Sequence, residues 1–237
     1  SSDLFTDWRG IFVVLSIIGV LLFVANFNFK ESLDESRRIK APLLETYGVY
    51  RQILINKTFM LFVAIQTCAL GTMFAYIACS SFIFQDFYGL SSMSYSVCFA
   101  SNGLALVIGS RTASFLKDKT ALRIGVYGIF ASSIVVGLIL TAKFHVYAVI
   151  VAFFIMLLFI GFILPTASSL AMNSARRYAG SASAVLGFCP FFLGGIVSPL
   201  VGLGDIFYSS SLTMLVCTLL ALTAFFKVMR GGHLQNG

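Results

Sequence analysis

The stretch VYAVIVAFFIMLLFIGFILPTASSLAM, residues 146–172, decides the fold class of this chain. It contains no Asp, Glu, Lys, Arg or His, and most of its side chains are apolar. An α-helix rises about 1.5 Å per residue, so a stretch of this length is long enough to cross the ~30 Å hydrocarbon core of a bilayer. We therefore predict a transmembrane helix here.

Six further apolar stretches of similar length predict that the chain crosses the membrane seven times. Hydrophobic residues make up 59% of the 237 residues and charged residues only 11%, whereas a soluble domain has about 25% charged residues. The predicted fold class is therefore an all-α membrane protein with seven transmembrane helices. The other six predicted spans are residues 10–29, 58–84, 93–115, 121–142, 179–203 and 206–226.

The distribution of Lys and Arg predicts the orientation. Fourteen of the 16 basic residues fall in connections on one side of the predicted membrane, and only Arg9 and Lys143 fall on the other. Cytoplasmic connections carry an excess of Lys and Arg, so we place the N-terminus of the chain outside and its C-terminus in the cytoplasm. The same residues predict contacts with anionic membrane lipids. Because they lie in short gaps between spans, we expect no nucleic-acid partner.

The longest connection, residues 30–57, predicts a short amphipathic helix. Four apolar or aromatic residues recur there at spacings of four, three and four, which places them on one helix face. Two interpretations remain open: a helix on the inner membrane surface, anchored by Arg51 and Lys57, or a helix packed on the cytoplasmic ends of the bundle. The four residues are Leu43, Tyr47, Tyr50 and Leu54.

The ionisable residues indicate no enzyme site. All nine acidic residues lie in connections or at span ends, and no span carries Lys, Arg or His near its middle. The sequence contains no common hydrolase, metalloprotease or nucleotide-binding motif, and its five cysteines form no CxxC or Cys–His cluster. We predict no enzyme activity, no cofactor and no metal.

Polar and aromatic residues inside the spans are the candidates for a substrate cavity. Gln66, Met73, Tyr76 and Ser80 are predicted to share a stripe on one span, and Asn102 lies in the next span. An amide in hydrocarbon needs a hydrogen-bond partner. It is either bonded to a neighbouring helix or part of a polar cavity wall, and both interpretations stay open. The candidate cavity residues are Gln66, Met73, Tyr76, Asn102, Thr166 and Phe188.

Glycines and prolines mark possible sites of close packing or bending. Three glycines of the span 179–203 are seven residues apart, which places them on one helix face and lets a neighbouring helix approach closely. Prolines in this span and in 146–172 remove backbone donors and permit bending. Tight packing and a gating hinge are both consistent with this pattern. The residues concerned are Pro165, Gly180, Gly187, Pro190, Gly194 and Pro199.

Four stretches resemble motifs of a known transporter family. They are DWRGIF (7–12), YGVYRQILINKTF (47–59), the loop region 109–125, and LPTA (164–167) followed by AGSASA (179–184). Together they are similar to the C-terminal portion of transporters of the major facilitator superfamily, and most of all to its bicyclomycin/chloramphenicol-resistance (Bcr/CflA) branch of drug:proton antiporters. The cytoplasmic basic loop in the third stretch contains Arg111, Lys117, Lys119 and Arg123.

This resemblance implies both a fold and a function. The seven spans would be helices six to twelve of a twelve-helix transporter, and the proton-coupling carboxylate would lie in five preceding helices. We then expect the chain to be part of a secondary active transporter of the bacterial inner membrane, which exports drugs or other small amphipathic molecules in exchange for protons. The substrate would sit near the midplane between two rocking repeats, against walls from spans 58–84, 93–115, 146–172 and 179–203.

The resulting organisation has four segments, and other functions remain as alternatives. The alternatives are a major facilitator transporter of a sugar, an amino acid or another metabolite and, more distantly, a seven-helix receptor or a structural membrane protein. The segments are a transmembrane helix (1–29), a cytoplasmic central loop with its short amphipathic helix (30–57), a six-helix C-terminal transporter half (58–226) and a cytoplasmic tail (227–237).

The predicted orientation can be tested by cysteine labelling. In a background without cysteines, we expect Gly89→Cys and Gly204→Cys to react with a membrane-impermeant thiol reagent added to intact cells. Thr120→Cys should react only after the membrane is opened, because its loop carries the basic residues that stay inside. Labelling of the Thr120 variant in intact cells would contradict the orientation.

Overall fold

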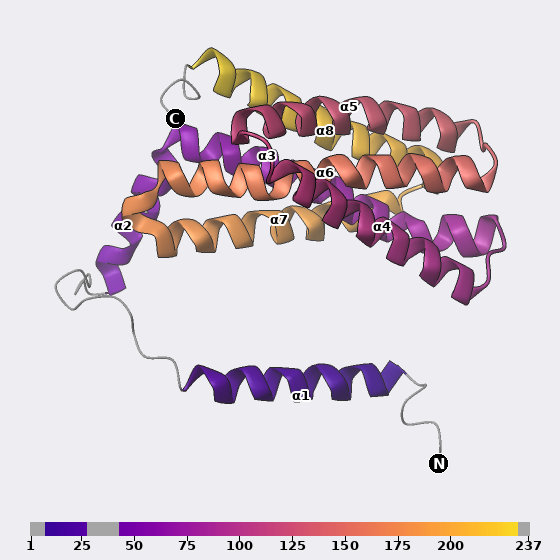
Figure 1. The fold of residues 1–237 in the computed structure, drawn as a ribbon, viewed down its shortest axis with the longest axis horizontal. Helices are drawn as coiled ribbons and strands as arrows, with labels where there is room; N and C mark the ends of the chain where they lie inside the picture. The colour runs from indigo at the N-terminus through magenta and orange to yellow at the C-terminus, as the bar shows by residue number, and fades with distance from the viewer. Residues whose placement is uncertain (1–7, 28–42, 232–237) are drawn as a thin grey trace. The chain divides into compact units, whose positions relative to one another are not determined.

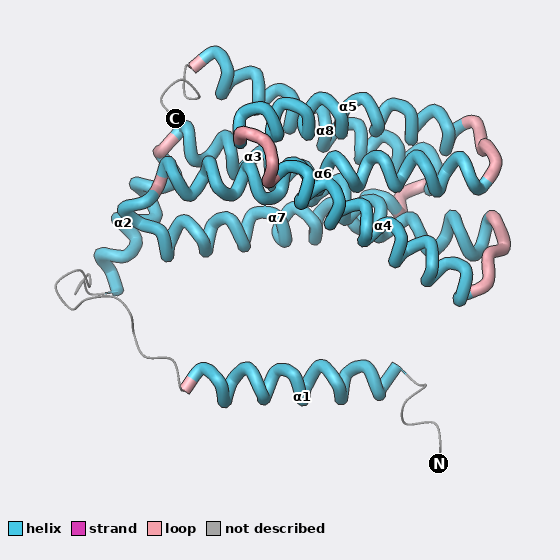
Figure 2. The backbone as a smooth tube through the Cα atoms, viewed as in Figure 1, coloured by secondary structure: helices cyan, strands magenta, loops and turns pink. Residues whose placement is uncertain are grey.

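The computed structural model describes residues 8–27 and 43–231 (Figure 1). Within these ranges the regular elements are all helical (Figure 2). They are α1 (Trp8–Asn26), α2 (Leu43–Ile55), α3 (Lys57–Ser81), the π-helix η3 (Phe82–Phe87), α4 (Ser92–Ala113), α5 (Asp118–Thr141), α6 (Val146–Ser174), the 3-10 helix η4 (Arg176–Tyr178), α7 (Ala179–Val201) and α8 (Ile206–Arg230).

The predicted spans correspond to α1 and to α3 through α8. The largest difference, four residues, is at the C-terminal end of α8. In the described part of the chain, α3 to α8 are long and apolar enough to cross a membrane, while α1 is apolar but shorter. This confirms the predicted all-α membrane fold. Residues 28–29 of the first predicted span, 30–42 of the central loop and 232–237 of the tail lie outside the described residues.

The chain divides into two compact units, Ser1–Leu43 and Leu44–Gly237. In the first unit, α1 exposes its side chains from residue 11 to its end. In the second unit, the helices surround one main apolar core, which includes the fully buried Phe59, Phe84 and Phe153.

Capping side chains and glycine turns define several helix boundaries. Asn56, Ser91 and Asp205 cap α3, α4 and α8, because each side-chain oxygen accepts a hydrogen bond from a backbone N–H two or three residues further on. Gly89 and Gly204 have φ angles of +68° and +81° in the turns before α4 and α8. Glycine adopts this left-handed conformation without a steric penalty, so these turns end one helix and start the next within a few residues.

Helices α3 and α6 are the central pair of the second unit. Figure 1 shows α3 to α8 lying side by side. α6 packs against α3, α4 and α5, and α3 packs against α6, α7 and α8. Polar side chains on α3 and α6 therefore have neighbouring helices within reach of a hydrogen bond.

α4 and α6 approach each other closely at two glycines. A Cβ atom added to Gly109 would overlap the carbonyl oxygen of Leu158, and one added to Gly161 would overlap that of Leu106. The same added Cβ on Gly161 would lie 3.1 Å from the Cα of Gly109. The two backbones are therefore in direct contact, which only glycine at both positions permits.

The helix predicted in the central loop is α2, and it packs on one end of the bundle. Ile53 is only 2% exposed and belongs to the main core. The hydroxyl of Tyr178 donates a hydrogen bond to Oε1 of Gln52 at 2.7 Å. Of the residues predicted to share one face, Tyr50 is partly buried against the main core and Leu54 is 51% exposed. The Gln52–Tyr178 bond and the burial of Ile53 turn the helix so that Leu54 points away, and this contact supports packing on the bundle end.

The glycine crossing gives a test of the fold. We expect Gly109→Ala to lower the free energy of unfolding by about 1–3 kcal/mol, because the added methyl group forces α4 away from α6. The measurement is reversible unfolding of the detergent-solubilised full-length protein, followed by circular dichroism.

Gly103→Ala on the same helix is the matched control. No atom lies within 4 Å of the Cβ it would add, and alanine favours the helix by about 1 kcal/mol over glycine. Its stability should be unchanged or slightly higher. Equal destabilisation by both substitutions would show that the α4–α6 crossing is not a tight contact.

Candidate functional site

Two hydrogen bonds connect α3 to α4 inside the bundle. The Nδ2 of Asn102 donates to the hydroxyl oxygen of Tyr76 at 2.8 Å. One turn further along α3, the hydroxyls of Ser80 and Tyr95 are 2.9 Å apart. Asn102 and Tyr76 are 1% and 2% exposed. The structure therefore brings together two of the predicted cavity residues in a buried polar contact.

Gln66 makes a separate contact with α6. Its Oε1 accepts a hydrogen bond from the hydroxyl of Ser168 at 2.8 Å. Tyr76 contacts α6 as well, because its ring packs against Phe153 of that helix, and its hydroxyl also reaches α4, so the shared stripe stays a prediction. Ten residues turn an α-helix by almost three full turns and leave the two side chains about 80° apart. Both amides bond between helices, and a role for either in a cavity wall stays a prediction.

Aromatic rings surround the Tyr76–Asn102 pair. Phe99 stacks on Tyr76 with 6.0 Å between ring centroids and 15° between the planes. Phe153 approaches the same ring at 4.9 Å. Phe153 is fully buried, whereas Phe99 is 39% exposed. Phe99 is therefore the member of this cluster whose ring is exposed at the surface of the bundle.

One atom of the cluster has no partner. The Oδ1 of Asn102 is buried and makes no hydrogen bond within the described part of the chain. A buried polar atom left unpaired costs about 1–3 kcal/mol, and such atoms are few in native structures. The amide is thus held by Tyr76 through its nitrogen, and its oxygen remains available as an acceptor.

The other predicted cavity residues lie apart from this cluster. The hydroxyl of buried Thr166 donates to the carbonyl oxygens of Phe162 and Ile163 in its own helix, at 2.6 and 3.1 Å. Met73 is partly buried against the main core. Phe188 is exposed and stacks on Phe192. No described contact brings these three side chains to Asn102.

The predicted packing and gating residues divide into two groups. Gly194 is in close contact, since a Cβ added there would collide with the ring of Phe74. Gly180 and Gly187 have no atom within 4 Å of an added Cβ. Prolines 165, 190 and 199 lie inside α6 and α7, and both helices continue through them. The roles in packing or gating of the open glycines and the prolines stay predictions.

The basic loop borders a groove between α4 and α6. The groove encloses about 500 Å³, and its lining includes Ser110, Arg111 and Ser114. The guanidinium carbon of Arg111 lies 5.2 Å from the ring centroid of Phe115. Asp118, at the start of α5, accepts a hydrogen bond from Ser169 at 2.9 Å. The remaining basic residues of this loop are Lys117, Lys119 and Arg123.

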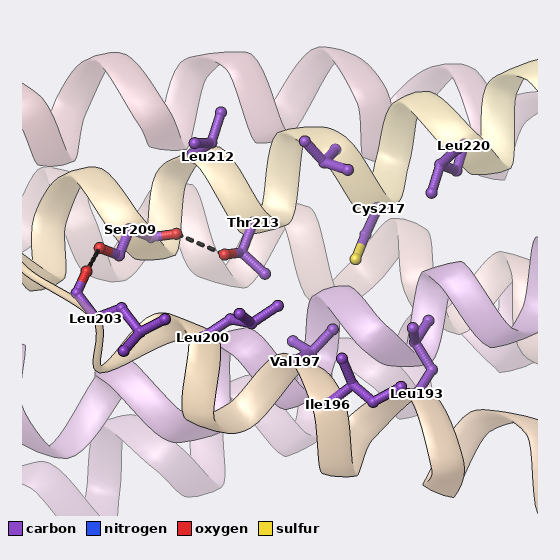
Figure 3. A pocket seen from close by; sticks show the side chains of 11 residues that line it. Leu193, Ile196, Val197, Leu200, Leu203, Ser209, Leu212, Thr213, Cys217 and Leu220 are labelled. Carbon is purple, nitrogen blue, oxygen red and sulfur yellow. Dashed lines mark hydrogen bonds between the residues drawn. The ribbon is translucent and has the colours of Figure 1, made fainter.

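A second groove, between α7 and α8, is almost entirely apolar (Figure 3). It encloses about 450 Å³ and is lined mostly by leucine, isoleucine and valine side chains. Its two hydroxyls are already bonded, because Ser209 donates to the carbonyl of Leu203 and Thr213 donates to that of Ser209. This groove suits a hydrocarbon chain, and its remaining polar group is the weakly polar thiol of Cys217.

Sequence reasoning missed the partners that complete the site. It did not include Ser168, Phe99 or Phe153. The requirement that Gln66 find a partner could have directed attention to a hydroxyl on a neighbouring span, such as Ser168 or Ser169. The structure uses Ser168 for Gln66 and Ser169 for Asp118, a choice that depends on the rotation of α6.

Comparison with known proteins gives consistent results. The sequence model of the Major Facilitator Superfamily matches residues 2–199. The chain is 34% identical over 206 residues to the uncharacterised MFS-type transporter YdgK of Bacillus subtilis, covering 85% of this chain and 51% of that protein. It is 26% identical over 237 residues to a bicyclomycin resistance protein homolog of Haemophilus influenzae, covering 94% of this chain and 58% of that protein.

The chain spans about half the length of these curated relatives. The second relative also agrees with the resemblance to the Bcr/CflA branch. The matched residues, the all-helical fold and the membrane-length helices lead to one conclusion: this chain belongs to the Major Facilitator Superfamily.

Proposed function

We propose that the chain is part of a secondary active transporter that exports drugs or other small amphipathic molecules across the bacterial inner membrane in exchange for protons. The observation that carries this proposal is the uncharged polar cluster of Tyr76 and Asn102 among aromatic rings, inside a bundle of transporter helices. The name of the Haemophilus relative, a bicyclomycin resistance protein homolog, supports a drug as substrate.

The chemistry of the site suits weakly polar molecules of varied shape. An amide can donate and accept hydrogen bonds without carrying a charge. Gln66 and Asn102 place such groups on α3 and α4, and aromatic rings offer flat apolar surfaces beside Asn102. A sugar carries many hydroxyls and needs more polar partners than these spans contain, so a metabolite transporter is the weaker alternative.

Proton coupling requires a titratable group within the membrane. The acidic residues of this sequence lie in connections or at span ends. Asp118, for example, begins α5 and is bonded to Ser169. We therefore assign the proton carrier to another part of the transporter, outside these 237 residues.

Transport by reconstituted protein tests this function. We expect the full-length transporter in liposomes to move bicyclomycin when a pH gradient is imposed and to stop when an ionophore collapses the gradient. Residues 1–237 alone should show no gradient-driven movement, because no span carries an acidic residue or a histidine near its middle. Gradient-driven uptake of a sugar or an amino acid, with none of bicyclomycin, would favour the metabolite alternative. Gradient-driven transport by the fragment would refute the assignment of the carrier.

Substitutions of the two amides test the site itself. We expect Gln66→Ala and Asn102→Ala in the full-length transporter to change which drugs are exported, with expression near normal, because each removes one uncharged polar group from the cavity wall. Export of a drug panel and thermal stability are measured together. A uniform loss for every drug, matched by lower stability, would mean that both amides serve only to hold helices together.

A further inference from the structure

The unpaired oxygen of Asn102 points to a selection rule for ligands. We propose that Oδ1 of Asn102 binds an N–H or O–H donor carried by a flat, largely apolar molecule, and that this contact selects such molecules over analogues without the donor. The inference rests on the proposed function, because it assumes that the cluster around Asn102 meets the transported ligand.

The first step is the direction of the existing hydrogen bond. Tyr76 accepts from Nδ2 of Asn102 at 2.8 Å, which fixes the amide and leaves Oδ1 buried without a partner. A carbonyl oxygen can only accept hydrogen bonds. The group that completes this site must therefore donate a proton, and a ligand that lacks a donor leaves the oxygen unpaired.

The second step is the shape of the surroundings. The ring of Phe99 lies nearly parallel to that of Tyr76, and Phe153 packs against Tyr76 at a tilt of 58°. Phe84 extends the aromatic cluster, with its ring centroid 6.1 Å from that of Phe153. Aromatic faces favour offset stacking with other flat rings. The donor should therefore be attached to a planar ring system.

The third step is access. Phe99 lies three residues before Asn102 on α4, so the two side chains are neighbours on one helix face. Phe99 is the partly exposed member of the cluster, while Asn102 itself is buried. In this proposal the Phe99 side chain rotates away, and the ligand ring takes the place of the Phe99 ring on Tyr76, beside Oδ1 of Asn102.

The test uses two neutral probes that differ by one donor. 2-Quinolone is flat and carries one N–H, and 1-methyl-2-quinolone carries a methyl group in its place. Equilibrium binding to the purified full-length transporter is measured without a pH gradient. We expect the wild type to bind 2-quinolone roughly three- to tenfold more tightly, the effect of one neutral hydrogen bond. Asn102→Leu should abolish this preference and leave the affinity for the methylated probe within about twofold of the wild type.

Two variants test whether the preference for the donor comes from the oxygen of Asn102 or from another group. Tyr76→Phe removes the hydroxyl but keeps Oδ1, so the preference for the donor should persist. Ser132→Ala on α5 is the control: its buried hydroxyl donates to the carbonyl of Ile129 in its own helix, and the preference should again persist. Loss of the preference in Tyr76→Phe would assign it to the tyrosine hydroxyl and overturn the proposal.

The remaining outcomes are equally decisive. Equal affinity of the wild type for both probes, including no measurable binding of either, would overturn the proposal, as would a preference for the methylated probe. A failure of proton-driven transport is a separate result, because the binding preference is measured without a gradient.

Discussion

The close crossing of α4 and α6 at Gly109 and Gly161 is the constraint on which the site depends. Helices in a membrane gain little from apolar burial against one another, since lipid is equally apolar, and they associate through close packing and hydrogen bonds. Backbone contact between these glycines fixes the position of α4 on the bundle. Asn102 lies seven residues, or about two turns, from Gly109 on the same face of α4, and the crossing therefore sets where its amide meets α3.

The position of α4 explains why only the nitrogen of the Asn102 amide has a hydrogen-bond partner. A surface amide would turn to water, but Asn102 is enclosed by Tyr76 and the surrounding rings. Its nitrogen reaches the tyrosine hydroxyl and its oxygen reaches no donor. Gln66, ten residues earlier on α3, has its oxygen paired with Ser168. The difference between the two amides is the reason for assigning ligand selection to Asn102.

The sequence predicted the spans well because the length of an apolar stretch is a local property. It predicted that Gln66 and Asn102 need partners for the same reason, since burial of an amide follows from its place in a span. It could not identify those partners, because they depend on how far each helix is rotated about its axis. The regular spacing of Gly180, Gly187 and Gly194 drew attention to α7, yet only Gly194 is in close contact within the described residues. The tightest contact is at Gly109 and Gly161, and the pairing of these two glycines depends on how α4 and α6 meet in the folded bundle.

The central claim is that the glycine crossing holds Asn102 against Tyr76, and a double-mutant cycle between Gly109→Ala and Tyr76→Phe tests it most directly. The free energy of unfolding is measured for the full-length wild type, both single variants and the double variant. If the crossing positions Asn102, Tyr76→Phe should cost about 0.6–1.7 kcal/mol in the wild type, the value of an interhelical hydrogen bond in a membrane, and almost nothing once Gly109→Ala has displaced α4. Additive effects of the two substitutions would contradict the account, because they would show that the hydrogen bond forms independently of the crossing.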